Sequence, residues 1–372
     1  MPVNYETTPD FAGRRARLAA AIGALGADVL VISDLVNLRY LTGFTGSNGS
    51  ALVRTDGPDL IATDGRYRAQ VAAQAPGLDV LIERDTVTAL VALLADHQGE
   101  LPLRVGFEAD AVTVAQFAGL SVLLDRAGLE LVPLRGTVEK LREVKDDGEI
   151  AQIEAACRLG DKALATLIER DGIVAGRTER EVARDLEWIM YGCGADAIAF
   201  ETIVAAGANS AIPHHRPTDA VLASGDFVKI DFGAVVGGYH SDMTRTFVLD
   251  QASDWQRAIY QIVADAQHAG RMALLPGAAL ADVDAAARDV ITAAGYGEQY
   301  VHGLGHGVGL AIHEAPGIGA AATGTLRDGA TVTVEPGIYL PGRGGVRIED
   351  TLVVTDSGAR SLTTSPRALQ VL

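Results

Sequence analysis

Two stretches of the chain each combine strand-like runs, a glycine-containing turn and a pair of acidic residues, and they constrain the fold more than any other feature. The first, DFVKIDFGAVVGGYHSDMTRTFVL, covers residues 226–249. A two-residue turn at Val236–Gly237 would place Asp231 directly across from Asp242, with Cβ atoms about 5 Å apart on one sheet face. Two like charges that face each other across a ladder destabilise it unless a cation lies between them.

The second stretch, TVTVEPGIYLPGRGGVRIEDTLVV, covers residues 331–354. A loop centred on Gly342 would place Glu335 across from Glu349. A one-residue slip would destroy either register, because side chains alternate between the two faces of a strand. Two hairpins that each hold an acid pair within apolar strands therefore predict a shared cation site rather than four solvated carboxylates.

Histidines lie between and before the two hairpins. The segment VHGLGHGVGLAIHEAP contains His302, His306 and His313, and its glycines allow backbone to approach a crowded centre closely. It is not a dinucleotide-binding fingerprint, because Val308 stands where the third glycine is required, and it lacks the second histidine of a zincin motif.

Further candidates precede the first hairpin and lie within the second. The segment NSAIPHHRPTD contributes His214 and His215. Adjacent residues of a strand point to opposite faces, so at most one of these two is expected to reach the site. Arg347 precedes Glu349 by two positions and shares its face in a regular strand. It is expected to act as a charge partner or a substrate contact.

Four carboxylates with one or more imidazoles make an oxygen-rich site. Such a site favours Mn²⁺, Co²⁺, Fe²⁺ or Mg²⁺ and also admits Zn²⁺. Four negative charges balance two divalent ions, and two such ions about 3.5–4 Å apart activate water and polarise a carbonyl. The pattern therefore predicts a hydrolase with two metal ions.

The chain has 372 residues, which exceeds what one hydrophobic core usually serves, so two domains are expected. The first 135 or so residues alternate between strand-like and helical runs, which predicts an α/β domain. The charged segment PLRGTVEKLREVKDD places the boundary at about residue 140. Beyond it, helices are expected from Glu149 towards Ile168, from a capping box at Thr178, and at about 255–274 and 279–294.

Composition excludes several classes of partner. A net charge of −17 disfavours nucleic acid and anionic lipid. No apolar run approaches the roughly 20 residues of a spanning helix, and the polar N-terminus MPVNYETTPD shows no signal peptide, so the cytoplasm is the expected compartment. Two widely separated cysteines, Cys157 and Cys193, give neither a disulfide framework nor a thiolate metal site.

The motifs KIDFG, YHSDMTRTF, GHGVGLAIHE, VTVEPGIY and GVRIEDT together resemble those of the metal-dependent Xaa-Pro peptidases, prolidase and aminopeptidase P. Methionine aminopeptidase is a more distant relative. Upstream, NLRYLTGFTGSNG and ATDGRYRAQ resemble the N-terminal domain of this family, and LREVKDDGEI resembles its domain junction. The resemblance runs essentially end to end, and the chain is similar to short bacterial cytoplasmic peptidases.

The resemblance implies a creatinase/prolidase-like α/β domain over residues 1–140 and an α+β pita-bread catalytic domain over residues 141–372. It implies that Asp231 chelates one metal ion and that Asp242 and Glu349 bridge both. His306 and Glu335 would complete the shell of the other ion, with Mn²⁺ the expected metal.

The resemblance also assigns roles in catalysis. Glu335 would act as general base, and His214 and His313 would hold the substrate carbonyl and stabilise the oxyanion. His302 and Arg347 would contact the substrate or support the ligands. Phe200 and Tyr239 are weak candidates for a proline pocket. A homodimer is expected from the family alone.

Two questions stay open at this stage: which peptides are cut, and whether the chain is a metal-dependent peptidase at all. A dipeptidase accepts only Xaa-Pro, whereas an aminopeptidase removes the first residue of a longer Xaa-Pro peptide. The same fold is also used by metal-free creatinase and by non-catalytic binding proteins such as a histone-chaperone subunit, so fold alone does not establish activity. Those relatives lack ligands of the metal set, which this chain retains.

Overall fold

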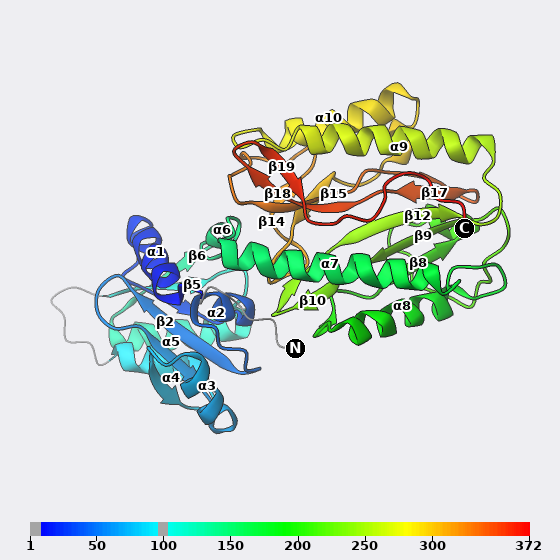
Figure 1. The fold of residues 1–372 in the computed structure, drawn as a ribbon. Helices are drawn as coiled ribbons and strands as arrows, with labels where there is room; N and C mark the ends of the chain where they lie inside the picture. Colours follow the sequence, from blue (N-terminus) through cyan, green and yellow to red (C-terminus); the bar gives the residue numbers. More distant parts are fainter. Residues whose placement is uncertain (1–8, 96–102) are drawn as a thin grey trace. The chain divides into compact units, whose positions relative to one another are not determined.

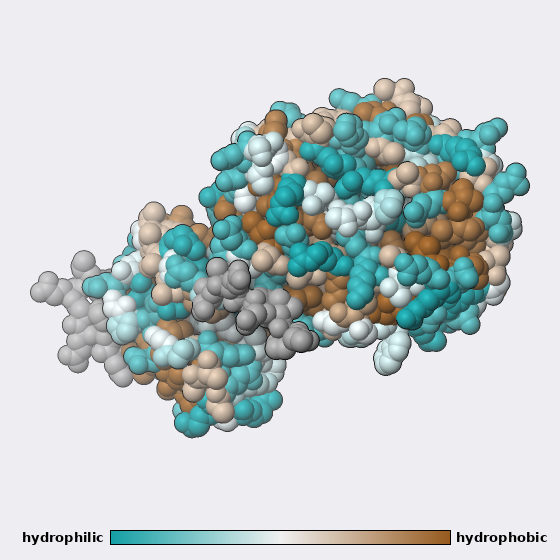
Figure 2. Space-filling view, viewed as in Figure 1, coloured by the Kyte–Doolittle hydropathy of each residue, from teal (hydrophilic) through white to brown (hydrophobic). Residues whose placement is uncertain are grey.

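The computed structural model describes residues 9–95 and 103–372. Its contacts divide the chain into two compact units, one ending at Arg142 and the other running Glu143–Leu372. The absence of a signal peptide was expected from residues 1–10. Of these, residues 1–8 lie outside the described residues. None of the described helices combines the length and apolar character needed to cross a bilayer. Hydrophilic side chains are spread over the visible face of each unit (Figure 2).

In the first unit, the described strands form one mixed sheet in the order β4-β3-β2-β1-β5-β6 (Figure 1). The strands are β1 (Val29–Ile32), β2 (Gly49–Arg54), β3 (Leu60–Thr63), β4 (Asp79–Ile82), β5 (Arg104–Glu108) and β6 (Glu130–Leu134). The helices are α1 (Phe11–Ala24), α2 (Leu35–Thr42), α3 (Arg68–Gln74), α4 (Thr86–Ala95), α5 (Val114–Ala127) and α6 (Glu139–Arg142). Apolar side chains of α4 and α5 pack with those of β1, β2, β3 and β5 in one core, so the predicted α/β character is confirmed.

The second unit contains longer helices and several small sheets. Its helices are α7 (Asp147–Glu169), α8 (Glu179–Cys193), α9 (Asp254–Met272) and α10 (Leu280–Ala293). Its strands up to the histidine-rich segment are β7 (Ala197–Ile198), β8 (Ile203–Ala206), β9 (Phe227–Phe232), β10 (Ala234–Val236), β11 (Tyr239–His240) and β12 (Met243–Val248). The rest are β13 (Gly305–Gly307), β14 (Glu314–Ile318), β15 (Thr331–Val334), β16 (Gly337–Leu340), β17 (Gly344–Arg347), β18 (Asp350–Thr355) and β19 (Gly358–Ser361).

The strands of the second unit lie between two helix pairs (Figure 1). Side chains of α7 and α8 share one apolar core with β8, β9 and β12. Side chains of α9 and α10 share another with β15 to β18. The predicted helix starts are confirmed; Thr178, for example, caps α8 through a reciprocal bond with Glu181. The helix pairs thus hold the two acidic hairpins between them.

The turn of the first acidic hairpin is Gly237–Gly238, with φ values of 58° and 83°. The predicted turn at Val236–Gly237 is wrong, because a type I′ turn needs positive φ at both central positions and glycine adopts it without strain. The register therefore moves by two residues, and Asp231 pairs with Thr244. Asp242 instead lies in the loop directly before β12.

The second acidic hairpin has the predicted loop, centred on Gly342 at a φ of 74°. On one side of the acids Gly337 pairs with Arg347, and on the other Val334 pairs with Asp350. Both pairings keep the same register. The two residues left at matching positions between them are Glu335 and Glu349, as predicted.

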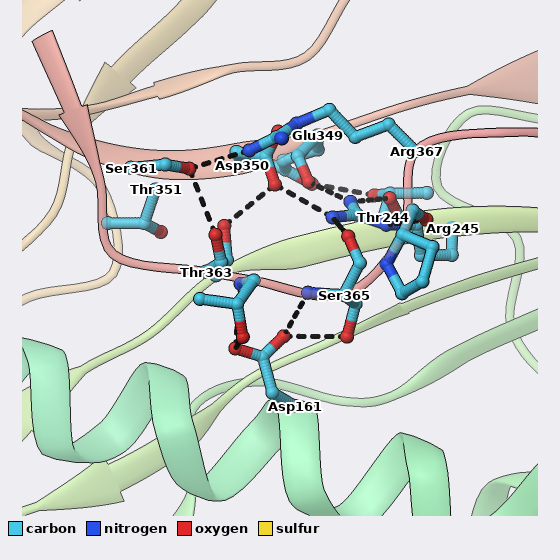
Figure 3. Close-up of polar contacts among 12 residues, drawn as sticks. Asp161, Thr244, Arg245, Glu349, Asp350, Thr351, Ser361, Thr363, Ser365 and Arg367 are labelled. Carbon is cyan, nitrogen blue, oxygen red and sulfur yellow. Dashed lines mark hydrogen bonds and ion pairs between the residues drawn. The ribbon is translucent and has the colours of Figure 1, made fainter.

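Asp350 anchors the C-terminal segment behind this hairpin (Figure 3). Its side chain is fully buried and accepts hydrogen bonds from Arg245 at 2.8 Å, Thr363 at 2.7 Å and Gln267 at 2.7 Å, and from Arg367. Burial disfavours the charged form, but the guanidinium groups of Arg245 and Arg367 outweigh it and lower the pKa of Asp350. The carboxylate is therefore charged and strongly paired at neutral pH.

We expect Asp350→Asn to lower the free energy of unfolding by about 3–5 kcal/mol at pH 7, because it leaves the buried guanidinium of Arg245 and the partly buried one of Arg367 uncompensated. A folded-state pKa below the unfolded value of about 3.9 stabilises above that value. The difference from wild type should therefore persist down to about pH 5 and shrink as the pH falls below about 4. Urea unfolding across this range measures it.

The control for this variant is Asp356→Asn, at an exposed turn position after β18. It should change stability by less than about 0.5 kcal/mol. Equal stability of Asp350→Asn and wild type at pH 7 would contradict the anchoring role.

Candidate functional site

A cavity of about 450 Å³ in the second unit brings together the residues that the sequence predicts to act. Its lining includes the predicted metal ligands, catalytic histidines and substrate contacts: His214, Asp231, Asp242, His302, His306, His313, Glu335, Arg347 and Glu349. Strand ends and short connecting loops supply these side chains. Backbone pairing beside each acid therefore fixes where its carboxylate stands.

The core of the site is a group of three predicted ligands. Asp242, His306 and Glu349 each offer one ligand atom, and these atoms all lie within 4.8 Å of one another. Among the described residues, this close group includes neither Asp231 nor Glu335. Glu335 is nonetheless adjacent, since its Oε1 lies 3.4 Å from Nε2 of His306, which is itself 3.6 Å from Oδ2 of Asp242.

The carboxyl groups of the cluster have raised pKa values. Burial, with the charges of Glu349 and Asp231 added, raises the pKa of Asp242 well above its usual range. Burial and the charges of Glu335 and Asp231 do the same to the pKa of Glu349. Burial raises the pKa of Glu335 to about 7. Each shift opposes the ionised form, so these acids require either protons or a cation.

His306 is suited to be a ligand of such a cation. Burial lowers the pKa of its imidazole to about 4, so the ring is neutral near pH 7. Its Nδ1 lies 3.0 Å from the carbonyl oxygen of Gly307, which can only accept, so Nδ1 carries the proton. Nε2 therefore directs a lone pair towards carboxyl oxygens of Asp242 and Glu335, which is repulsive unless a carboxyl proton or a metal cation lies between them.

Asp231 offers a further donor atom to the same cavity. Its Oδ2 accepts a hydrogen bond from Nη2 of Arg347 at 2.5 Å. Its Oδ1 is buried and has no hydrogen-bond partner among the described residues. A buried, unpaired carboxylate oxygen is costly. Together with the imidazole and the other carboxylates, it fits hard or borderline divalent metal ions.

Arg347 supports the ligands from behind. Its side chain is 2% exposed, and besides Asp231 it donates to Thr244 Oγ1 at 2.9 Å and to the hydroxyl of Tyr339 at 2.8 Å. Thr244 in turn donates to Glu349 at 2.6 Å. Arg347 thus connects ligands from both hairpins, and its role as a substrate contact stays a prediction.

His302 lies at the end of the same hydrogen-bond chain. Its Nδ1 donates to the carbonyl oxygen of Gly303 at 2.8 Å, so its Nε2 accepts from the hydroxyl of Tyr339 at 2.9 Å. Burial lowers the pKa of His302 to about 4. Both ring nitrogens are therefore engaged by the protein, and a direct contact of His302 with substrate also stays a prediction.

His214 and His215 both line the cavity. The expectation that at most one reaches the site is wrong, because their segment is not a strand and its side chains do not alternate. His215 is bound to Glu179 at 2.8 Å. None of the described residues hydrogen-bonds to the ring of His214, whose pKa is lowered by burial and by Arg347. His313 packs edge-on against His306, with 4.4 Å between ring centroids.

The apolar part of the cavity is lined by Phe200, Ile203 and Ile312. Tyr239 is not in the lining, and its hydroxyl donates to Glu149 at 2.9 Å, so the suggestion that it shapes a proline pocket is wrong. Tyr339 also contributes to the site and was not predicted from the sequence. Its tyrosine side chain in a strand looks like ordinary packing, and only the tertiary contact with Arg347 reveals its role.

Comparison with known proteins agrees with this architecture. The model of metallopeptidase family M24 matches residues 151–356, and that of the creatinase/prolidase N-terminal domain matches residues 14–144. The chain is 40% identical over 356 residues to the uncharacterized peptidase YqhT of Bacillus subtilis, which covers 96% of this chain and 99% of that protein.

Solved structures are similar along nearly the whole chain. An Xaa-Pro dipeptidase from Bacillus anthracis has a TM-score of 0.92 at 38% identity and covers 98% of this chain and 100% of its own. An X-Pro aminopeptidase from Thermotoga maritima has a TM-score of 0.85 at 33% identity and covers 96% of this chain and 99% of its own. The predicted creatinase/prolidase-like domain followed by a pita-bread domain is confirmed.

We expect a divalent ion such as Mn²⁺ to raise the melting temperature of the protein, because it relieves the repulsion among buried carboxylates. At a concentration 100 times its Kd, a bound ion contributes about 2.7 kcal/mol. His306→Ala should abolish most of this shift in a thermal-unfolding assay. Glu201→Gln, which neutralises an exposed acid on the rim of the same cavity, should retain it. An unchanged shift in His306→Ala would contradict the assignment.

Proposed function

Because the chain belongs to metallopeptidase family M24, we propose that it hydrolyses the peptide bond between an N-terminal residue and proline. The observation that carries this proposal is the buried convergence of Asp242, His306 and Glu349, beside the unpaired oxygen of Asp231. The similar solved structures named as an Xaa-Pro dipeptidase and an X-Pro aminopeptidase support the choice of substrate.

The proposal includes two divalent metal ions, with Mn²⁺ the expected metal and Co²⁺, Fe²⁺ or Zn²⁺ as alternatives. Their proposed ligands are Asp231, Asp242, His306, Glu335 and Glu349. When bound, such ions activate water at neutral pH and polarise a substrate carbonyl. The hard, oxygen-rich donor set with one imidazole supports this range of metals.

Glu335 is proposed as the general base. Its carboxylate is adjacent to the imidazole of His306 and accepts a hydrogen bond from Thr333 at 3.2 Å, which orients it towards the cavity. It would take a proton from the attacking water. A carboxylate with a raised pKa is a better proton acceptor than an exposed one.

His214 and His313 are proposed to act on the substrate carbonyl. Both residues line the cavity, and a neutral imidazole can donate one N–H to an oxygen that gains negative charge. His302 and Arg347 are proposed to complete the substrate site. The apolar side chains of Phe200, Ile203 and Ile312 offer a surface against which a pyrrolidine ring can pack.

Proline makes particular demands on such a site. An amide at proline nitrogen has no N–H, so a protease that aligns substrate through that group cannot use it. The fixed φ of the ring instead favours recognition by shape. The apolar lining beside the carboxylate cluster supports this mode of recognition.

The proposal extends to the setting of the enzyme. We place it in the cytoplasm as a homodimer that takes Xaa-Pro peptides and binds neither nucleic acid nor membrane. The net charge of −17 supports the last point. We also propose a domain boundary at about residue 140, which the contact-based division at Arg142 and the family matches to 14–144 and 151–356 support.

We expect the protein to hydrolyse Ala-Pro after chelation and restoration of Mn²⁺, and to be inactive after chelation alone. An Ala-Ala control should be cleaved at least about tenfold less efficiently, because it does not fill the apolar surface. A longer Ala-Pro-Pro peptide distinguishes the dipeptidase, which rejects it, from the aminopeptidase, which accepts it. Preference for Ala-Ala would contradict the proline assignment but not the hydrolase assignment.

We expect His214→Ala and His313→Ala each to lower kcat by about 10²–10³-fold, the usual cost of losing one donor to a developing oxyanion. Neither should abolish the Mn²⁺-dependent shift in melting temperature. His268→Ala, on the exposed face of α9, is the matched control and should retain full activity. Near-normal kcat in both cavity variants would remove these histidines from the proposed mechanism.

A further inference from the structure

The position of His214 depends on its backbone, because none of the described residues hydrogen-bonds to its ring. The segment around it runs from a 3-10 turn at Gly207–Ala211 to Thr218 without any strand. Ladder hydrogen bonds therefore do not hold it. Some other feature has to fix the backbone if the imidazole is to face the carboxylate cluster.

Lys229 contacts this segment directly before His214. Its side chain lies on β9 with no exposed surface, two positions before Asp231. The ammonium nitrogen donates to the carbonyl oxygens of Ile212 at 2.6 Å and Pro213 at 3.1 Å. Both carbonyls precede the imidazole in the chain, so this contact sets the direction in which His214 leaves the segment.

Burying the amino group of Lys229 costs folding free energy. Within the described part of the chain, no carboxylate oxygen lies within ion-pair distance of its nitrogen. Its partners are two neutral carbonyls and the ring face of Tyr339, whose centroid is 5.1 Å away. Burial disfavours the charged form of this amino group and lowers its pKa, and replacement of such a buried group by an apolar side chain is often neutral or stabilising. Stability alone therefore does not account for a lysine here.

The other side of the segment is fixed by a second buried group, Glu179. One of its oxygens accepts from the backbone of Ala206 at 2.8 Å and from Asn209 at 2.9 Å. The other accepts from His215 at 2.8 Å and from the backbone of Thr218 at 2.9 Å. Glu179 thus holds residues on both sides of His214 but not the carbonyls that precede it. Those are left to Lys229, with Pro213 also accepting from Arg347 at 3.2 Å.

We propose that Lys229 is a positioning residue for His214, holding the carbonyls of Ile212 and Pro213 so that the imidazole faces the carboxylate cluster. This inference rests on the proposed function, because it assumes that His214 acts on the substrate. It assigns a role in the reaction to a side chain that does not itself line the cavity.

A double-mutant cycle tests the proposal by activity. Lys229→Met keeps most of the length and apolar packing of the side chain but removes the N–H donors, and should lower kcat/KM for Ala-Pro by about ten- to a hundredfold through misplacement of His214. In a His214→Ala background the same change should cost less than about twofold. An equal cost in both backgrounds would overturn the proposal.

Lys145→Met is the matched control. Lys145 is an equally buried lysine of the same unit, but it pairs with Glu314 at 2.8 Å, beside His313 rather than His214. Lys145→Met should therefore lower kcat/KM by the same factor with and without His214. A cost that vanishes in the His214→Ala background for both lysines would overturn the specific link to Lys229.

A second readout needs no activity. In protein labelled with ¹³C at histidine Cε1, the His214 resonance is identified by its absence in His214→Ala. It should shift or broaden in Lys229→Met and stay unchanged in Lys145→Met. An unchanged His214 resonance in Lys229→Met would overturn the proposal, whereas wild type that cleaves no Xaa-Pro peptide would overturn only the proposed function.

Folding is checked by thermal unfolding of each variant. Lys229→Met should melt within a few degrees of wild type. If it does not fold, Lys229→Gln replaces it in the cycle. This variant keeps N–H donors in its amide, so it should lose less activity than the ten- to hundredfold expected for loss of all donors. Failure of both to fold would overturn the proposal, since the lysine would then be holding β9 rather than His214.

Discussion

The repulsion among buried carboxylates is the constraint on which the catalytic unit depends. Asp242 and Glu349 contribute to one close group, and Glu335 lies beside it. Burial removes the water that would screen their charges, so their pKa values rise. Metal ions would replace the protons that these acids otherwise need, and metal binding is thereby linked to proton release. The fold tolerates this cluster because backbone pairing in two hairpins holds the acids in place.

Arg347 offsets only part of the negative charge of the cluster, since its Nε lies 3.9 Å from Oε2 of Glu335. Arg347 pairs with only one oxygen of Asp231 and leaves the other without a partner. Asp350, the neighbour of Glu349, takes up both Arg245 and Arg367 on the opposite side of the strand (Figure 3). Glu349 directly precedes β18, and neighbouring residues of an extended chain point to opposite sides. Asp350 therefore pairs with two arginines, whereas Glu349 reaches the carboxylate cluster. This separation explains how adjacent carboxylates have pKa shifts of opposite sign.

The sequence allowed much of this site to be predicted where local turn chemistry sets the geometry. Gly342 defines a loop with one natural register, so Glu335 and Glu349 were placed correctly. Gly237–Gly238 defines an equally clear type I′ turn, but the turn was placed one residue early, and Asp231 was given the wrong partner. Asp242 still reaches the cavity because its loop, rather than a ladder, positions it. Such a position depends on tertiary packing and has no local signal.

Glu179 and Lys229 were not predicted, because their contacts too depend on tertiary packing and have no local signal in the sequence. Glu179 reads in the sequence as an acidic residue in the first turn of a helix, a role that the helix dipole already explains. Lys229 reads as a polar residue on one face of a strand. Neither pattern reveals that the two side chains converge on a single non-strand segment. Only the path of that segment between α8 and β9 makes the contacts possible.

The side chains of the site are therefore positioned in two different ways. The proposed metal ligands lie in or beside paired strands, where ladder hydrogen bonds fix the backbone and the side chains need little further support. His214 and His313 lie outside strands, and buried polar side chains hold their segments: Lys229 and Glu179 for the first, and the Lys145–Glu314 pair for the second. Buried charges of this kind add little stability on their own. Their value lies in geometry, because a donor to a developing oxyanion loses its effect when it is displaced by a fraction of a hydrogen-bond length.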